Sequence, residues 1–97
     1  MSYWLHPAAE GELTAAAVYY SEKANGRVAD AFLTEFERVI AFLDQNQQLG
    51  TPVTEGLRIH PFHRFPYSVV YREADSGPRV YAISHQKREP GYWQSRL

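Results

Sequence analysis

Apolar residues recur at helical spacing through the first half of this chain and at strand spacing through the second. The helical repeat consists of Leu13, Ala16, Ala17 and Tyr20 in one stretch and of Ala29, Phe32, Phe36, Val39, Ile40 and Leu43 in the next. Pro7 suits the first turn of a helix, where a missing N–H costs nothing, and Asn25-Gly26 marks a break. The pattern therefore predicts two helices, over about residues 7–23 and 27–47.

After a break at residues 50–52 the pattern becomes that of β-strands. Polar and apolar residues alternate over residues 57–62, while residues 67–72 and 79–84 are rich in β-branched and aromatic side chains. A short aromatic run at residues 3–6 predicts one further strand before the first helix. The segment after the last strand is expected to form a turn or a final half-helix.

The predicted order of elements is β-α-α-β-β-β, which indicates the α+β class. Two consecutive helices followed by hairpin-linked strands favour a helical hairpin packed on a mainly antiparallel sheet. The 97 residues are predicted to form a single domain spanning residues 1–97. Cysteine is absent, which excludes disulfides and thiolate chemistry. With no signal peptide and no apolar run of about 20 residues, the sequence predicts a cytoplasmic protein without membrane contact.

The net charge of −1 conceals two halves of opposite sign. Residues 1–55 carry three basic and eight acidic side chains, whereas residues 56–97 carry seven basic and three acidic ones. A small domain cannot easily bury so many unpaired cations. The basic half is therefore expected to present a surface to an anionic partner. The alternative is an ordinary solvated face that balances the acidic helices.

Two groups of candidate residues lie in the middle of the basic half. Arg58 and His60 are two residues apart on a predicted strand, so that both side chains lie on one face of it. An open face would present a cation beside a titratable imidazole, whereas the alternative is two polar residues on a solvated side. His63 and Arg64 are expected at a hairpin turn, because Pro66 interrupts strand pairing. There Arg64 could hold a phosphate, or a carboxylate of the first helix.

A third group follows the last predicted strand, where functional side chains often concentrate. His85 could exchange a proton near neutral pH, and Lys87 and Arg88 could neutralise phosphates. Tyr92 or Trp93 could stack on a base, although the two aromatic rings could equally cover the edge of the core. The histidine spacing matches no standard metal site, and no nucleotide-binding loop is present, so neither a metal nor a cofactor is expected.

In the order of its elements and motifs, the chain resembles the RelE/ParE superfamily. This superfamily comprises toxins of bacterial type II toxin–antitoxin modules, and some of these modules are plasmid stabilisation systems. The resemblance covers nearly the whole length and rests on the element order together with several short motifs. These motifs are Phe36-Glu37-Arg38-Val39-Ile40-Ala41-Phe42-Leu43, Gly56-Leu57-Arg58, Arg64-Phe65-Pro66-Tyr67-Ser68-Val69-Val70-Tyr71-Arg72 and Ala82-Ile83-Ser84-His85-Gln86-Lys87-Arg88-Glu89-Pro90-Gly91-Tyr92-Trp93.

The branch of the superfamily decides the activity. RelE-like members are ribosome-dependent mRNA endonucleases, and the resemblance carries their basic second-strand positions onto Arg58 and His60. Their C-terminal arginine falls on Arg88, and their tyrosine lies near Tyr92. Their third-strand arginine falls on Ser68, and this loss should weaken stabilisation of charge at a cleaved phosphate.

As a ribonuclease, the chain would have the catalytic set Arg58, His60, Arg64, His85, Arg88 and Tyr92, with Lys87 and Trp93 in contact with RNA or another target. ParE-like members share the fold, lack the nuclease residues and poison DNA gyrase through protein contacts. Because of Ser68, the sequence favours the ParE-like activity over the ribonuclease. A third possibility is a degenerate toxin that only binds its antitoxin. All three imply a growth-regulating module with a cognate antitoxin, whose C-terminal segment wraps the toxin.

Overall fold

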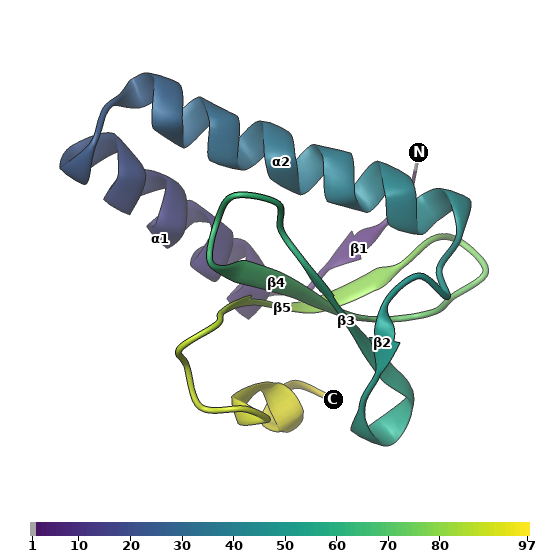
Figure 1. The fold of residues 1–97 in the computed structure, drawn as a ribbon. Helices are drawn as coiled ribbons and strands as arrows, with labels where there is room; N and C mark the ends of the chain where they lie inside the picture. Colours follow the sequence, from purple (N-terminus) through teal and green to yellow (C-terminus); the bar gives the residue numbers. More distant parts are fainter. Residues whose placement is uncertain (1) are drawn as a thin grey trace.

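The computed structural model describes residues 2–97. Two helices follow a first short strand, β1 (Trp4–Leu5), and form an antiparallel pair: α1 (Pro7–Lys23) and α2 (Gly26–Gln45) (Figure 1). The Nδ1 atom of His6 accepts the Ala8 N–H at 3.0 Å at the start of α1, and the Oδ1 atom of Asn25 accepts the Val28 N–H at 3.1 Å at the start of α2. These side chains satisfy N–H groups that have no partner within a helix. The predicted bounds of α1 are confirmed, and those of α2 are confirmed to within two residues.

A five-stranded mixed sheet packs against the helices, with the order β1-β5-β4-β3-β2. Strands β3 (Leu57–Pro61), β4 (Tyr67–Arg72) and β5 (Arg79–His85) form an antiparallel meander, whereas β1 pairs with β5 in parallel. The predicted α+β class and the mainly antiparallel sheet are confirmed. The sequence missed β2 (Thr51–Pro52), which pairs with β3. This strand is too short to show a period, and its proline is tolerated because β2 is an edge strand.

The sheet is covered on both faces. On the helix side, Phe32, Phe36 and Ile40 of α2 pack with Val69 and Ile83 of the sheet. The C-terminal segment after β5, residues 86–97, crosses to the opposite side, and it includes a short 3-10 helix, η2 (Tyr92–Arg96) (Figure 1).

There Trp93 lies on a second, smaller cluster with Leu57, Val70 and Ala82. A sheet with both faces covered leaves few surfaces on which polar side chains can be freely placed. Across residues 2–97, neither helix is both long and apolar enough to span a membrane.

Candidate functional site

Arg58 and His60 share one face of β3, as their spacing predicts, and this face is the one turned towards the helices. In the sheet Arg58 lies opposite Tyr71 and His60 lies opposite Val69, and both of these partners belong to the helix-side core. Neither side chain is fully open to solvent. The sequence therefore placed the two residues together correctly, but the face they share is not an open basic surface.

Arg58 is engaged in holding the connection between α2 and β3. Its guanidinium donates to the carbonyl of Gly50 at 2.8 Å and to the Glu73 carboxylate at 3.1 Å. Next to it, the hydroxyl of Tyr71 donates to the carbonyl of Gln47 and accepts the N–H of Gly50. These bonds fix the connection onto the sheet and occupy the cation that could have met a phosphate.

His60 lies beside α2, where burial lowers the pKa of its imidazole. The nearby Arg38 guanidinium lowers this pKa further, and Glu35 offsets part of the effect. A histidine in such a place is neutral at pH 7. It could accept a proton only if a substrate reached the margin between β3 and α2.

Arg64 lies in the loop that joins β3 to β4, as predicted from Pro66, and it is exposed. The carboxylate that the loop does meet is Glu35 of the second helix, which accepts the backbone N–H of His63. The same carboxylate binds Arg38 in a two-point ion pair with N–O distances of 2.6 and 2.7 Å. The hydrogen bonds from Arg38 hold the pKa of Glu35 below its ordinary value despite partial burial.

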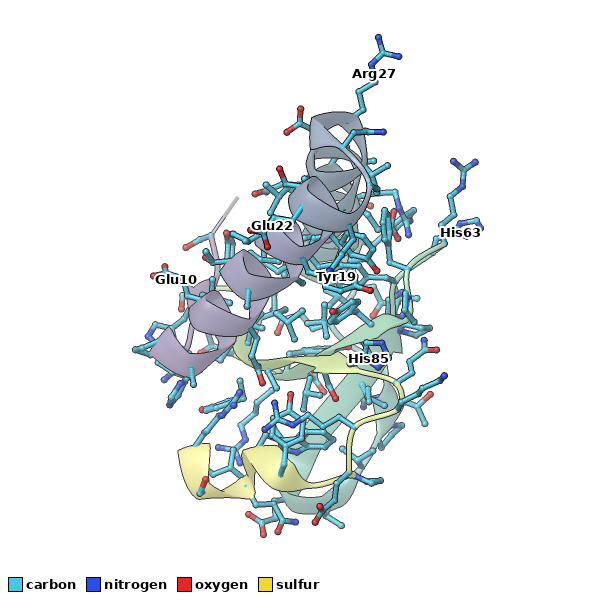
Figure 2. All side chains as sticks on the ribbon, turned by 90° about the vertical axis from the view of Figure 1, so that its left-hand side faces the viewer. Glu10, Tyr19, Glu22, Arg27, His63 and His85 are labelled. Atoms are coloured by element: carbon cyan, nitrogen blue, oxygen red, sulfur yellow. The ribbon has the colours of Figure 1, made fainter. Side chains whose placement is uncertain are left out.

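His85 ends β5 on the helix side of the sheet, in edge-to-face contact with Tyr67 at a ring separation of 5.0 Å. Its Nδ1 atom accepts the backbone N–H of Lys87 at 3.0 Å. The imidazole lines a hollow of about 250 Å³ with Tyr19, Arg88 and Glu12, and Figure 2 shows Tyr19 and His85 on the same side of the molecule. His85 is thus the candidate histidine that shares an accessible hollow with a C-terminal cation.

Glu12 of α1 organises the C-terminal segment, a role that the sequence did not reveal. Its carboxylate binds the guanidinium of Arg96 at 2.8 and 3.0 Å and accepts the hydroxyl of Tyr92 at 2.7 Å. It also accepts the backbone N–H of Ile83 at 3.0 Å. Strand β1 is only two residues long and pairs with β5 at Arg79 and Val80, so it does not reach this N–H. Burial alone would raise the pKa of Glu12, but these hydrogen bonds lower it below its ordinary value.

Arg88 and Tyr92, the two C-terminal positions matched to nuclease residues, both belong to this cluster. The Arg88 guanidinium lies over the Tyr92 ring at 3.6 Å from its centre and reaches Glu12 at 3.3 Å. Burial and the hydrogen bond to Glu12 raise the pKa of Tyr92 to about 12. The phenol is therefore harder to ionise than that of an ordinary tyrosine. Lys87 is exposed, whereas Trp93 is buried in the second core.

The structure separates the six candidate catalytic residues into two groups. Arg58, His60 and Arg64 belong to β3 and its loop, next to α2, whereas His85, Arg88 and Tyr92 belong to β5 and the C-terminal segment, next to α1. Strand β4 lies between β3 and β5, and two strand spacings amount to about 10 Å. A general acid and a general base must each reach the reacting group within hydrogen-bond distance. Of the six candidates, only His85 and Arg88 line a common hollow, and Tyr92 does not line it.

Ser68, the position that carries an arginine in the nuclease branch, lies on the other face of β4 from Tyr67 and is buried, as is Ser84 opposite it. The two serines border a second hollow, of about 180 Å³, together with Trp93 and Arg88. Along residues 2–97, no group of three or more histidine, aspartate or glutamate side chains could hold a metal ion.

One comparison with known proteins identifies the family, and another identifies the fold. A family model described as the ParE toxin of the type II toxin–antitoxin system parDE matches residues 3–90. Among solved structures, one described as the chromosomal ParDE TA system from P. aeruginosa superposes with a TM-score of 0.74 at 22% sequence identity. The match covers 88% of this chain and 95% of that one, which demonstrates a shared fold. No curated protein sequence matches significantly.

Proposed function

The chain belongs to the ParE toxin family of type II toxin–antitoxin systems, and we propose that it inhibits growth by binding DNA gyrase, without nuclease activity of its own. The observation that carries this proposal is the engagement of Arg88 and Tyr92 by Glu12. In a ribonuclease these positions would face RNA. Here they bind a carboxylate of α1, Tyr92 through its hydroxyl at 2.7 Å and Arg88 through a half-exposed guanidinium at 3.3 Å.

Loss of the third-strand cation supports the same proposal. Ser68 is buried beside Trp93 and, unlike the arginine that the nuclease branch has at this position, supplies no charge to stabilise a cleaved phosphate. A toxin that acts by contact needs only a folded surface that complements its target. Because gyrase and the transcripts that a ribonuclease would cut are both cytoplasmic, we place the activity in the cytoplasm.

We further propose that a cognate antitoxin neutralises this toxin. The similar solved structure is described as a ParDE toxin–antitoxin system. The exposed apolar side chains Val18 and Tyr19 on α1 and Leu33 and Phe42 on α2 supply surface that a partner could cover.

A ribosome-dependent ribonuclease is the second candidate, and one observation favours it. His85 and Arg88 line the same hollow, which would place a titratable imidazole beside a cation near one phosphate. In that case His85→Ala would abolish cleavage without unfolding the protein, because the His85 side chain is only partly buried.

Cells that express the toxin alone distinguish the two activities. DNA synthesis and protein synthesis are followed separately by pulse labelling in the first minutes after induction. We expect DNA synthesis to stop first, with the DNA-damage response induced. An early stop in protein synthesis, with transcripts cut inside codons, would contradict the proposal and favour the ribonuclease.

A further inference from the structure

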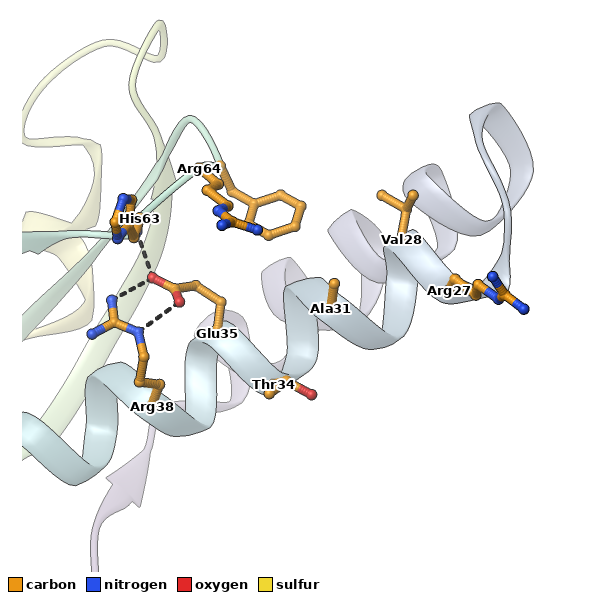
Figure 3. A pocket seen from close by; sticks show the side chains of 9 residues that line it. Arg27, Val28, Ala31, Thr34, Glu35, Arg38, His63 and Arg64 are labelled. Atoms are coloured by element: carbon orange, nitrogen blue, oxygen red, sulfur yellow. Dashed lines mark hydrogen bonds and ion pairs between the residues drawn. The ribbon is translucent and has the colours of Figure 1, made fainter.

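A groove lies between the N-terminal half of α2 and the loop that joins β3 to β4, away from the Glu12 cluster. It has a volume of about 550 Å³, and its apolar lining comes from Val28, Ala31 and Phe65 (Figure 3). The lining residues on α2 extend from Arg27 to Arg38, which corresponds to about 16 Å along a helix axis. The groove is therefore long enough for a peptide segment of about five extended residues.

The charge around this groove is strongly positive. Three arginines line it, Arg27, Arg38 and Arg64, against the single carboxylate of Glu35. That carboxylate is already bound by Arg38 and by the His63 N–H (Figure 3). Within the part of the chain that the structure describes, neither Arg27 nor Arg64 makes an ion pair. The first turn of α2 contains no acidic residue to offset the positive end of its dipole.

The backbone conformation of Arg64 is a second, independent observation. Its φ of 77° lies in the left-handed region, which non-glycine residues rarely adopt. An L-residue adopts this conformation at a cost in free energy, because its Cβ comes too close to the following carbonyl oxygen. Glycine would relieve that strain but would provide no cation at the groove. Strained residues of this kind are concentrated at binding sites.

We propose that this groove binds an acidic segment of the cognate antitoxin, with a bulky apolar side chain against Val28, Ala31 and Phe65 and carboxylates on Arg27 and Arg64. The inference rests on the proposed function, because it takes the antitoxin as the partner. The apolar lining explains why the occupant is a peptide with an apolar side chain. The two unpaired arginines explain why the bound segment is acidic. Because Arg38 already binds the Glu35 carboxylate, that charge does not repel an acidic segment.

Charge reversal tests the proposal on the purified toxin with its full-length antitoxin. The double variant Arg27→Glu/Arg64→Glu is compared with wild type and with Lys23→Glu, which reverses an exposed charge at the end of α1. Dissociation constants are measured by calorimetry at low and high salt. We expect the double variant to bind at least about tenfold more weakly at low salt, and Lys23→Glu to bind like wild type. Replacing single antitoxin carboxylates by lysine should identify one that restores binding.

A second variant tests whether weaker binding comes from the groove itself and not from loss of folding. Ala31 is exposed on α2, and Ala31→Trp would fill the groove without changing its charge. We expect it to weaken antitoxin binding while thermal unfolding stays close to that of wild type. Unchanged binding in both variants would overturn the inference and leave the proposed function intact.

Two further outcomes separate the inference from its premise. If the wild-type toxin does not bind the antitoxin at all, the proposed partnership and the inference both fail. If the double variant binds the antitoxin normally but no longer inhibits gyrase, the groove serves the target, and the antitoxin assignment is wrong.

Discussion

Replacing Glu12 by alanine removes the carboxylate that holds the C-terminal segment against α1 and β5. The variant loses two hydrogen bonds from Arg96 and one each from the Arg88 guanidinium, the Tyr92 hydroxyl and the Ile83 N–H. The side chains of Glu12 and Arg96 are only 15% and 14% exposed. The substitution therefore leaves a nearly buried guanidinium without its carboxylate, although Arg96 keeps its bond to the Tyr81 carbonyl.

Removing one partner of a buried ion pair costs about 3–5 kcal/mol. Because both side chains retain some contact with solvent, we take the lower end, about 3 kcal/mol, as the expected loss. For a domain of this size each kcal/mol lowers the unfolding temperature by about 4–8 °C. Glu12→Ala should therefore melt about 12–24 °C below wild type.

Thermal unfolding followed by circular dichroism measures this difference, and Glu10→Ala is the matched control. Glu10 is exposed in the first turn of the same helix, where losing a carboxylate costs less than about 1 kcal/mol. Limited trypsin digestion should also cut Glu12→Ala faster after Lys87 and Arg88. If Glu12→Ala melts within a few degrees of Glu10→Ala, the carboxylate does not hold the C-terminal segment and our reasoning about this cluster is wrong.

Three further predictions concern substitutions or titrations of single residues. Because folding lowers the pKa of Glu12, the stability that its carboxylate supplies is complete above the ordinary glutamate pKa and is lost as pH falls through the lowered one. In urea unfolding measured at a series of pH values, Glu12→Gln should therefore lose less unfolding free energy in acid than wild type. An equal loss in the two proteins would contradict this. Because burial lowers the pKa of His60, NMR titration should give a midpoint below about 6.5, and a higher midpoint would refute its placement. A Cβ at Gly50 would lie 2.6 Å from the Tyr71 hydroxyl, whereas one at Gly11 would meet nothing within 4 Å. Chemical denaturation should therefore show that Gly50→Ala lowers the free energy of unfolding and that Gly11→Ala raises it by about 0.4–1 kcal/mol. Equal effects of the two substitutions would contradict the packing around Gly50.

Much of the fold could be predicted because its local signals are strong. Pro7 and Asn25 mark the starts of both helices, and the apolar stripe of α2 matches the residues that the structure buries. Strand β2 could not be predicted, since two residues, Thr51 and Pro52, are too few to show a periodic pattern. The pairing of β1 with β5 depends on residues far apart in the sequence.

The candidate site was predictable only in part, for a geometric reason. The two-residue period places Arg58 and His60 on one face of β3, but it does not say which face the helices cover. In a sheet covered on both sides, Leu57 and Ile59 pack with the C-terminal segment and the polar pair lies towards the helices.

In the sequence, Glu12 stands out only as an acidic residue near the start of the first predicted helix, where a carboxylate complements the helix dipole. One signal could have revealed more, because Glu12 lies between Ala9 and Ala16 on the buried stripe of α1. Its partners are 71 to 84 residues away, and no local pattern identifies them.

The central claim is that this toxin acts by contact and not by cutting RNA. One preparation of purified toxin, added in parallel to a gyrase supercoiling reaction and to translating ribosomes, tests this claim most directly. We predict that supercoiling is inhibited in proportion to the toxin added, while the messenger RNA stays intact. Messenger RNA cut inside codons, together with normal supercoiling at saturating toxin, would contradict the account and identify the hollow beside His85 and Arg88 as an active site.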